Sequence, residues 1–290
     1  MKTDKEEILA ALHLADFEVR YVSTKEVDIE TALKKSADLV VAAGGDGTIG
    51  KVLRSLPDRS VPVGLLPLGT ANNIARSLGI AGRPHEVVES WKMDHCILID
   101  IGAVKAPWGT SQFVESFGVG LFPMFFKMAA KRKKPEGADN LLKGREWLQK
   151  AVKSADAVEI DVTVDGKSVR GEFLGVEIMN TPFTGPGLPL AAKAHVGDGL
   201  LNLICFEADR RKELIKWLDA PQDEPPPVIA RQGAKIEVTW ADVANRLDDQ
   251  TFDHEGTKQI AELTCEPDQV NILMPVKHPV QVAHEAKASA

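Results

Sequence analysis

The chain has 290 residues, of which 44% are apolar and 27% charged, a composition that excludes a disordered or fibrous protein and allows one large domain or two ordinary ones. Its net charge of −7 argues against nucleic acid as the main partner, because phosphate backbones select basic surfaces. No stretch approaches the roughly 18 apolar residues needed to span a bilayer, and residues 1–12 lack a signal-peptide core, so we expect a cytoplasmic protein.

The N-terminal third alternates helix and strand patterns. Apolar spacing predicts helices at 6–14, 29–35 and 72–78, a further helix after residue 48, and strands at 17–22, 38–43 and 61–66. Because such alternation covers both faces of a parallel sheet, we expect an α/β domain in this part of the chain.

Strand patterns dominate from about residue 95 onward. We expect strands at 96–104, 112–118, 158–164, 173–179, 200–206, 235–240, 259–265 and 269–274, and a helix at 139–153. Strict alternation up to Asp165-Gly166 predicts a hairpin turn there. The predicted architecture is an α/β domain with a parallel sheet (1–94 with the tail 276–290) and a β-rich, antiparallel, sandwich-like domain (95–275), with a cleft between them.

A glycine turn follows the first strongly apolar strand pattern. Its residues are Gly44, Gly45, Asp46, Gly47 and Thr48. The glycines allow close approach to a ligand, and the helix that follows places the turn at a helix N-terminus, where N–H groups and the macrodipole favour phosphate. A carboxylate beside such an anion site usually reaches it through a metal ion or water.

Two known phosphate-binding motifs nearly match the residues of this turn. A P-loop fits at its glycines and at Lys51, but Val52 stands where a Ser or Thr should contact Mg²⁺. The second motif combines this turn with a later segment. There, Gly69 and Thr70 end a strand and Asn72 caps a helix, which adds N–H donors beside the first turn.

The two segments together, in this order, resemble the nucleotide loops of the diacylglycerol kinase-like bacterial lipid kinases, relatives of sphingosine and ceramide kinases. The resemblance extends over most of the chain. It implies an ATP-dependent kinase that transfers the γ-phosphoryl group to a hydroxyl of a membrane lipid such as diacylglycerol. It also implies nucleotide contacts from Thr24, Gly44, Gly45, Asp46, Gly47, Thr48, Gly69, Thr70 and Asn72.

Catalytic residues follow from the same resemblance. It implies that Asp46 and Asp100 hold Mg²⁺ through water beside the phosphates. It assigns Glu255, in a segment similar to the family's Asp-Gly-Glu turn, as the base that takes the proton of the lipid hydroxyl, with Asp253 as the alternative.

A structural metal site is implied as well. The segment 195–203 is similar to the family's Asp-Gly-Leu-Leu segment, in which a carboxylate and backbone carbonyls bind Mg²⁺. Here Asp198 would supply the carboxylate, and His195 and Leu200 the carbonyls. A plain Asp-Gly turn into the next strand is the alternative interpretation.

The chain departs from the family at several positions. Lys51 reverses a charge near the expected phosphates, Asn73 replaces an Asp of the metal network, and the family's opening Asn-Pro-x-Ser-Gly loop has no counterpart. Two other functions therefore stay open: a kinase of a small soluble hydroxyl compound such as NAD, or a nucleotide- or lipid-binding relative without catalysis.

Membrane contact is also expected to be transient and peripheral. The basic run 131–134 directly follows the apolar run 122–128. Such a run predicts either a solvated helix end or a contact with anionic headgroups. The sequence leaves the oligomeric state open.

Overall fold

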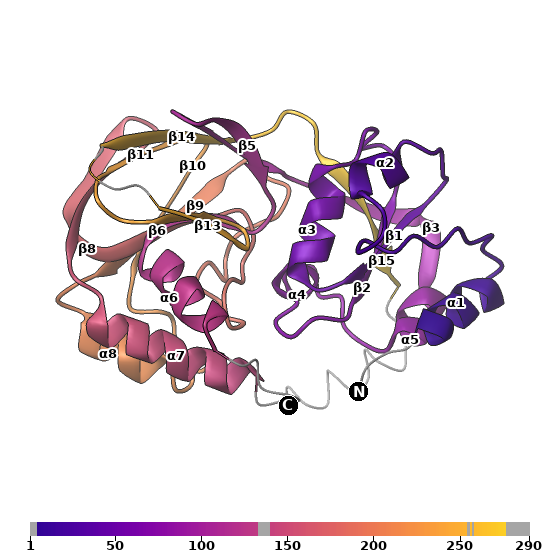
Figure 1. Ribbon diagram of the computed structural model, residues 1–290, viewed down its shortest axis with the longest axis horizontal. Helices are drawn as coiled ribbons and strands as arrows, with labels where there is room; N and C mark the ends of the chain where they lie inside the picture. The colour runs from indigo at the N-terminus through magenta and orange to yellow at the C-terminus, as the bar shows by residue number, and fades with distance from the viewer. Residues whose placement is uncertain (1–4, 133–139, 254–255, 257, 277–290) are drawn as a thin grey trace.

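The computed structural model describes residues 5–132, 140–253, 256 and 258–276. These residues form two domains side by side, an α/β domain and a larger β-rich domain (Figure 1). The fold class expected from the sequence is therefore confirmed. No helix of the described residues has both the length and the apolar character that crossing a membrane requires.

The first domain contains a four-stranded sheet in the order β1-β2-β15-β3. Strands β1, β2 and β15 are parallel, whereas β3 is antiparallel to β15. Their bounds are β1 Val40–Gly44, β2 Val63–Pro67, β3 Trp91–Ile99 and β15 Val270–Pro275. The last described strand thus returns to the first domain and lies between β2 and β3.

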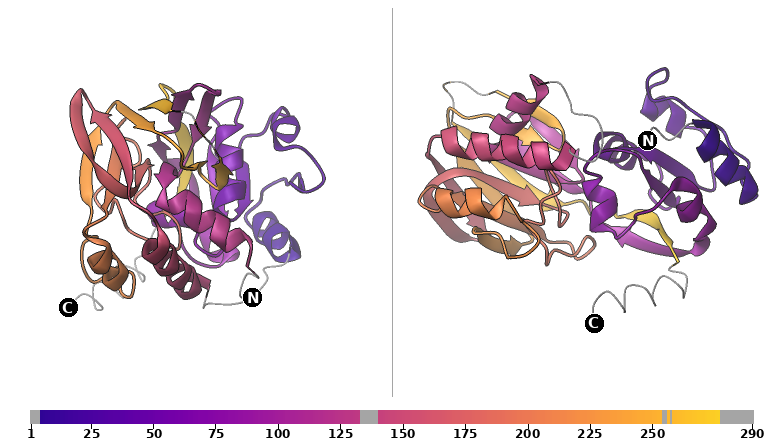
Figure 2. Two further views of the ribbon diagram at one scale, coloured as in Figure 1. Left: turned by 60° about the vertical axis from the view of Figure 1, so that its left-hand side comes forward. Right: turned by 90° about the horizontal axis from the view of Figure 1, so that it is seen from below.

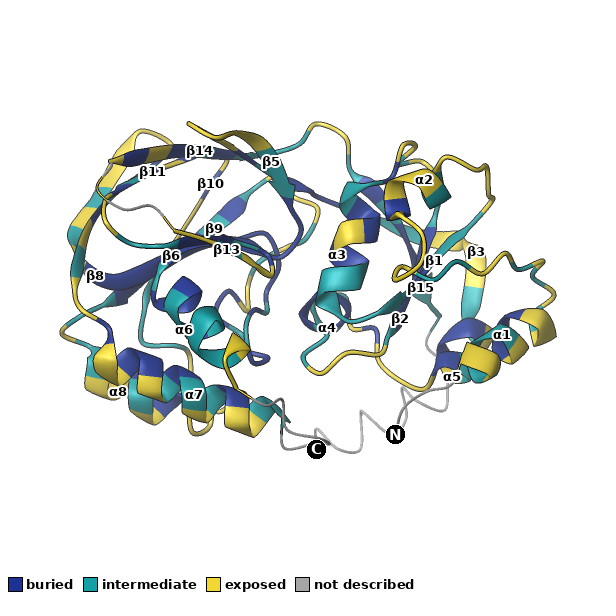
Figure 3. Ribbon diagram, viewed as in Figure 1, coloured by how far each residue is buried: buried dark blue, intermediate teal, exposed yellow. Residues whose placement is uncertain are grey.

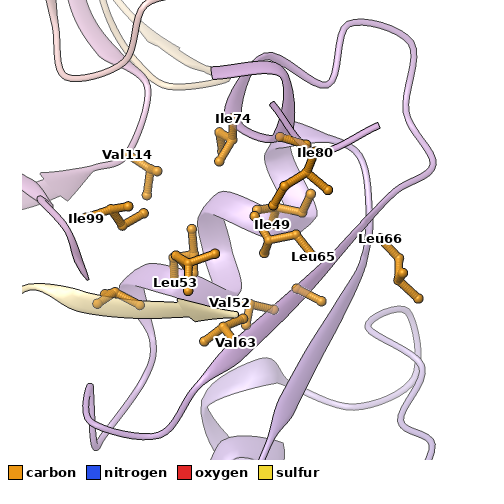
Figure 4. Close-up of a cluster of buried hydrophobic side chains, with 14 of the residues drawn as sticks. Ile49, Val52, Leu53, Val63, Leu65, Leu66, Ile74, Ile80, Ile99 and Val114 are labelled. Atoms are coloured by element: carbon orange, nitrogen blue, oxygen red, sulfur yellow. The ribbon is translucent and has the colours of Figure 1, made fainter. Parts of the chain in front are cut away.

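Five helices of the described residues belong to this domain, and α3 and α4 begin shortly after β1 and β2 end. Their bounds are α1 Lys5–Leu14, α2 Ile29–Leu33, α3 Asp46–Arg54, α4 Asn73–Ser77 and α5 Pro84–Glu89. In α3, Ile49 and Leu53 lie one turn apart and are fully buried in a cluster with Leu65 of β2 (Figure 4). Because burying each such side chain stabilises the fold by about 1.5–3 kcal/mol, this apolar stripe holds α3 against the sheet.

The second domain is an eleven-stranded sheet whose pairings are antiparallel among the described strands. Its bounds are β4 Gly102–Ala106, β5 Gly109–Phe113, β6 Ser116–Gly120, β7 Val158–Val164, β8 Lys167–Met179, β9 Leu201–Glu207, β10 Ile229–Gly233, β11 Ile236–Trp240, β12 Asn245–Leu247, β13 Gln250–Phe252 and β14 Gln259–Cys265. The predicted hairpin turn joins β7 to β8, and Asp165 and Gly166 have positive φ values of 45° and 80°.

Three further helices pack on one side of this sheet: α6 Leu121–Ala130, α7 Asn140–Ser154 and α8 Arg211–Trp217. Figure 2 shows α7 and α8 side by side, and the carboxamide of Gln149 on α7 donates to the carbonyl of Ile215 on α8 at 3.0 Å. Their inward residues are buried and their outward residues exposed (Figure 3). A second core therefore lies between these helices and the sheet.

Some predicted elements differ from those observed. Residues 17–22 form no strand, and the strand predicted at 96–104 is divided into β3 and β4 where the chain passes from one sheet to the other. The spacing of apolar residues does not predict α6, because four of its first five residues are buried and it lacks a polar stripe there. Residues 95–99 and 270–275, expected in the β-rich domain, pair in the first sheet.

Candidate functional site

The first glycine turn joins β1 to α3 through Gly45 alone. A Cβ atom at Gly44 would lie 2.7 Å from the Cβ atom of Thr48, so the turn accepts only glycine there without a shift. Gly45 is the N-cap of α3 and makes no side-chain cap hydrogen bond, since it has no side chain. The N-cap residue therefore offers no acceptor to the first N–H groups of α3, which lie at the positive end of the helix dipole.

The second turn packs directly against the first. The N–H of Leu68 donates to the carbonyl of Gly44 at 2.8 Å, and a Cβ atom at Gly69 would lie 2.6 Å from the Cα atom of Gly45. Asn72 has a left-handed conformation with φ 48°, and its side chain bonds the N–H and the carbonyl of Gly69 at 2.8 and 3.0 Å. Asn72 thus shapes the turn, while Thr70 is exposed.

Asp46 connects the two turns. Its Oδ1 accepts the N–H of Ile74, in the first turn of α4, at 2.9 Å. Burial raises the pKa of Asp46, although backbone N–H groups of Ile74, Asn73 and Asn72 oppose the rise. The carboxylate therefore lies between the first turns of α3 and α4, and no cationic side chain of the described residues forms an ion pair with it.

Asn73 and Glu115 extend this polar cluster into the second domain. The Nδ2 atom of Asn73 donates to Glu115 Oε2 and to the carbonyl of Gly185, both at 3.0 Å. Its Oδ1 atom is buried and has no hydrogen-bond partner among the described residues. Burial raises the pKa of Glu115 to about 7, against the effect of Arg246, and the nearby Asp46 charge adds to the rise.

Arg246 is the buried cation of the cluster. Its guanidinium bonds Glu177 at 2.9 Å and Thr184 at 2.7 Å, and lies 3.5 Å from Glu115. It also stands 4.8 Å from the ring centroid of Phe126. One guanidinium thus serves two buried carboxylates, which leaves Glu115 incompletely neutralised.

Asp248, in the turn between β12 and β13, ties this cluster to the first domain. It forms an ion pair with Arg54 of α3 and accepts the N–H of Glu115 at 2.8 Å. Burial raises its pKa, and Arg54 opposes the rise. The neighbouring Asp249 is exposed, and a Cβ atom added at Gly47 would lie 2.7 Å from its Oδ2. An exposed carboxylate therefore faces the N-terminus of α3.

The hydrogen bonds of Asp100 lie away from the glycine turns. Its carboxylate accepts the N–H of Gly199 at 2.7 Å and the carboxamide of Gln269 at 2.8 Å. Asp100 thus anchors the 195–200 loop, and none of its described hydrogen bonds reaches Asp46. Sequence reasoning links these two carboxylates, whereas the structure brings Asp46 near Glu115.

The 195–200 loop has the features of a plain turn. Asp198 accepts the N–H of Leu200 and the carboxamide of Gln232, both at 3.1 Å, and His195 is exposed. Over the described ranges there is no group of three or more His, Cys, Asp or Glu side chains arranged to hold a metal ion. The predicted set is of another kind, one carboxylate from Asp198 with the backbone carbonyls of His195 and Leu200, and it stays a prediction.

The remaining predicted residues are spread around the site. Glu255 lies outside the described residues, and the alternative base Asp253 forms an exposed ion pair with Lys127 of α6. Thr24 is exposed in the segment before α2. Lys51, a residue that departs from the family pattern, lies 3.8 Å from the carboxylate of Asp28, which caps α2. The charge of Lys51 is therefore directed toward α2.

Four residues of the site escape the motif search: Glu115, Arg246, Asp248 and Asp249. Of the buried ones, Glu115 lies in an apolar strand pattern, between Val114 and Ser116-Phe117. Because a charge is rarely buried without a partner, such a position is a detectable signal.

Comparison with known proteins agrees with this geometry. Residues 1–104 match the family model described as diacylglycerol kinase catalytic domain, and residues 146–273 match the YegS C-terminal NAD kinase beta sandwich-like domain. The diacylglycerol kinase of Bacillus subtilis (strain 168) is 30% identical over 225 residues, which cover 72% of this chain and 70% of that protein.

Solved structures share the fold. A diacylglycerol kinase from Bacillus anthracis str. Sterne superposes with a TM-score of 0.62 at 16% identity, covering 88% of this chain and 83% of that chain. An NAD kinase from Archaeoglobus fulgidus, in complex with ATP, superposes with a TM-score of 0.54 at 16% identity, covering 99% and 96%. On the family models and the Bacillus subtilis relative, this chain belongs to the diacylglycerol kinase-like lipid kinases, a family of enzymes.

Proposed function

We propose that the protein transfers the γ-phosphoryl group of ATP to a hydroxyl of a lipid such as diacylglycerol. The observation that carries this proposal is the backbone contact between Gly45 and Gly69, which joins two glycine turns at the N-termini of α3 and α4. Two sets of N–H donors beside a helix dipole form an anion site suited to a triphosphate. Gly44 to Thr48, with Gly69 and Thr70, would bind the phosphates.

Magnesium would be held at the cluster of Asp46, Asn73 and Glu115. Two carboxylates, one of them hydrogen-bonded to Asn73, and an amide oxygen of Asn73 that has no partner among the described residues offer the oxygen ligands that a hard cation prefers, bound through water. This assignment gives Glu115 the role that the sequence suggested for Asp100. When bound, the cation would neutralise charge on the transferring phosphoryl group.

The proton of the acceptor hydroxyl would go to Asp249. As the hydroxyl oxygen attacks the γ-phosphorus, the O–H proton passes to this carboxylate and ADP leaves. Asp249 is exposed and faces the first turn of α3, whereas Asp248 is engaged by Arg54 and by backbone N–H groups. Asp248 would hold the turn that positions Asp249. Glu255 stays a prediction from the family resemblance.

An acceptor panel with γ-labelled Mg·ATP tests this function. Diacylglycerol, phosphatidylglycerol, sphingosine and ceramide would be presented in mixed micelles, with NAD as the soluble acceptor. We expect label to enter at least one lipid. Label in NAD alone would replace the lipid proposal by an NAD kinase-like function, and label in no acceptor despite ATP binding would indicate a relative that only binds nucleotide.

A further inference from the structure

Two arginines from different domains lie near one another without a carboxylate partner. Arg76 is in the last turn of α4, in the α/β domain, and Arg145 is on α7, in the β-rich domain. Among the described residues, neither side chain forms an ion pair or a hydrogen bond. The chain has a net charge of −7, so this lack of a counter-ion does not reflect a shortage of acidic residues.

Both arginines approach the same short segment, 183–187. A Cβ atom added at Gly187 would lie 3.8 Å from the Cζ atom of Arg76 and 3.6 Å from a methyl group of Leu141, so α4 and α7 meet at this glycine. Leu141 and Arg145 are four residues apart on α7 and therefore share one face of the helix. Figure 1 shows the N-terminal end of α7 directed toward the α/β domain. The two guanidiniums thus approach one place from opposite domains.

Arg145 is poorly solvated for a cation. Its side chain is only partly exposed, and its Nε atom is buried without a hydrogen-bond partner in the part of the chain that the structure describes. Burial lowers the pKa of Arg145, and the charge of Arg76 lowers it further. Because arginine stays protonated in proteins, the repulsion persists and destabilises the contact between the domains. With Nε closed off, the Nη atoms are the donors left for a ligand.

Arg76 is held in place by an aromatic ring. Its Cζ atom lies 5.6 Å from the ring centroid of Phe183, and the N–H of Phe183 donates to the hydroxyl of Ser77 at 3.3 Å. A cation meets the face of a ring through the π electrons, so this contact uses none of the N–H donors of Arg76 in a hydrogen bond. These donors therefore remain available.

Two guanidiniums with available N–H donors suit a phosphate group. Arginine pairs with phosphate oxygens through two parallel N–H donors, and such charge-assisted bonds are stronger than neutral ones. A phosphate monoester carries about two negative charges at neutral pH, enough to offset both cations, whereas a carboxylate carries one. The donors come from both domains, so a bound phosphate would also link the domains.

We propose that Arg76 and Arg145 form a second phosphate-binding site, which joins the α/β and β-rich domains when it is filled. The phosphate comes either from inorganic phosphate or from a phospholipid headgroup. Neither guanidinium makes a hydrogen bond or ion pair with Asp46 or Glu115 among the described residues. The inference therefore does not depend on the proposed kinase function.

Calorimetric titration with inorganic phosphate tests this site. The protein is first mixed with Mg²⁺ and a non-hydrolysable ATP analogue, which occupies the glycine turns. We expect Arg145→Met and Arg76→Met each to weaken phosphate binding at least about tenfold, the loss of about one charged hydrogen bond. Any phosphate at the glycine turns is common to all variants, so the comparison holds even where the analogue does not bind.

Arg170→Met is the matched control. Arg170 lies on β8 and forms an exposed ion pair with Asp161 at 3.4 Å, so this variant removes the same charge from the same domain. It should bind phosphate as the wild type does. Undiminished affinity in folded Arg145→Met and Arg76→Met proteins, or no phosphate binding by the wild type, would overturn the proposal.

Urea unfolding separates an anion site from a structural arginine. Without phosphate, Arg145→Met should be at least as stable as Arg170→Met, because one of two repelling cations is gone. Added phosphate should then raise the urea midpoint of Arg170→Met more than that of Arg145→Met, since only the former retains the site. An Arg145→Met protein that is the less stable of the two without phosphate, and that gains as much from phosphate, would contradict the site.

Micelles identify the source of the phosphate. Phosphatidic acid in neutral detergent micelles competes with inorganic phosphate, and phosphatidylcholine in the same micelles is the reference. Displacement by phosphatidic acid assigns the site to a lipid headgroup, and no displacement assigns it to free phosphate. Phosphate binding that depends on Arg145 without phosphoryl transfer to any acceptor would count against the kinase function alone. Transfer with undiminished phosphate binding in Arg145→Met would count against this site alone.

Discussion

Asp248 and Asp249 are adjacent in the chain but differ in environment. Asp248 is buried and paired with Arg54, so its oxygens are occupied. Asp249 is exposed beside Gly47, which leaves lone pairs toward the space in front of α3. A general base needs a free lone pair within reach of the hydroxyl, and this requirement separates the roles of the two residues.

Asp249→Asn should therefore lower kcat for lipid phosphorylation by about 10²–10⁴, the usual contribution of a general base, while ATP binding persists. Asp253→Asn is the control, because Asp253 is exposed and pairs with Lys127. Steady-state kinetics of both variants decide the assignment. A full loss of activity in Asp253→Asn, with normal activity in Asp249→Asn, would assign the general base to Asp253 instead.

Glu115 should make stability depend on pH. Burial raises its pKa from 4.5 to about 7, so the folded protein holds the proton more tightly than the unfolded chain. The free energy of unfolding should fall as pH rises from about 4.5 to about 7, by on the order of 3 kcal/mol, and then level off. Asp46 and Asp248, with raised pKa values, act in the same direction.

Urea unfolding between pH 5 and 8 without divalent cations measures this slope. Glu115→Gln keeps a polar group facing Asn73 but cannot ionise, so its stability should fall less across that window. Equal slopes in the two proteins would mean that Glu115 ionises normally in the fold.

At the scale of elements, the two glycine turns matter through their contact. Gly69→Ala would place a Cβ atom 2.6 Å from the backbone of Gly45, so the turns must separate. We expect Mg·ATP affinity to fall at least about tenfold by calorimetry, since about one well-formed charged hydrogen bond is lost. Gly79→Asn is the control, because Gly79 has open space around it and Asn tolerates its positive φ of 69°. Equal affinities in both variants would show that the contact is unimportant.

These turns could be predicted from the sequence because their information is local. Each turn is a few glycines between an apolar strand and a helix, and strand, turn and helix all form close to the predicted positions. The polar cluster could not be predicted in the same way, since Arg246 and Glu115 are 131 residues apart and meet only through the order of strands. The same limit explains β15, which reads as one more antiparallel strand but pairs in the first sheet.

At the scale of the whole molecule, the Arg54–Asp248 ion pair joins the two domains, beside the hydrogen bonds that Asn73 makes to Glu115 and Gly185. It joins α3 to the β12–β13 turn, and therefore fixes the phosphate turns relative to Asp249. The β-rich domain supplies Glu115, whereas the α/β domain supplies Asn73 and the glycine turns. Neither domain therefore contains the site alone.

Arg54→Met should destabilise the protein by about 3–5 kcal/mol, because it leaves the buried Asp248 unpaired. Arg83→Met removes an exposed pair with Glu86 and should cost less than about 1 kcal/mol. Adding Asp248→Asn to Arg54→Met should recover part of the loss in urea unfolding. A cost for Arg54→Met no greater than that for Arg83→Met would refute the coupling.

A crystal structure with Mg²⁺ and a non-hydrolysable ATP analogue tests the central claim most directly. The account predicts phosphates on the N–H groups of residues 45–48 and 69–70, with the γ-phosphate between the N-terminus of α3 and Asp249. An analogue bound elsewhere, or phosphates turned away from both glycine turns, would contradict it.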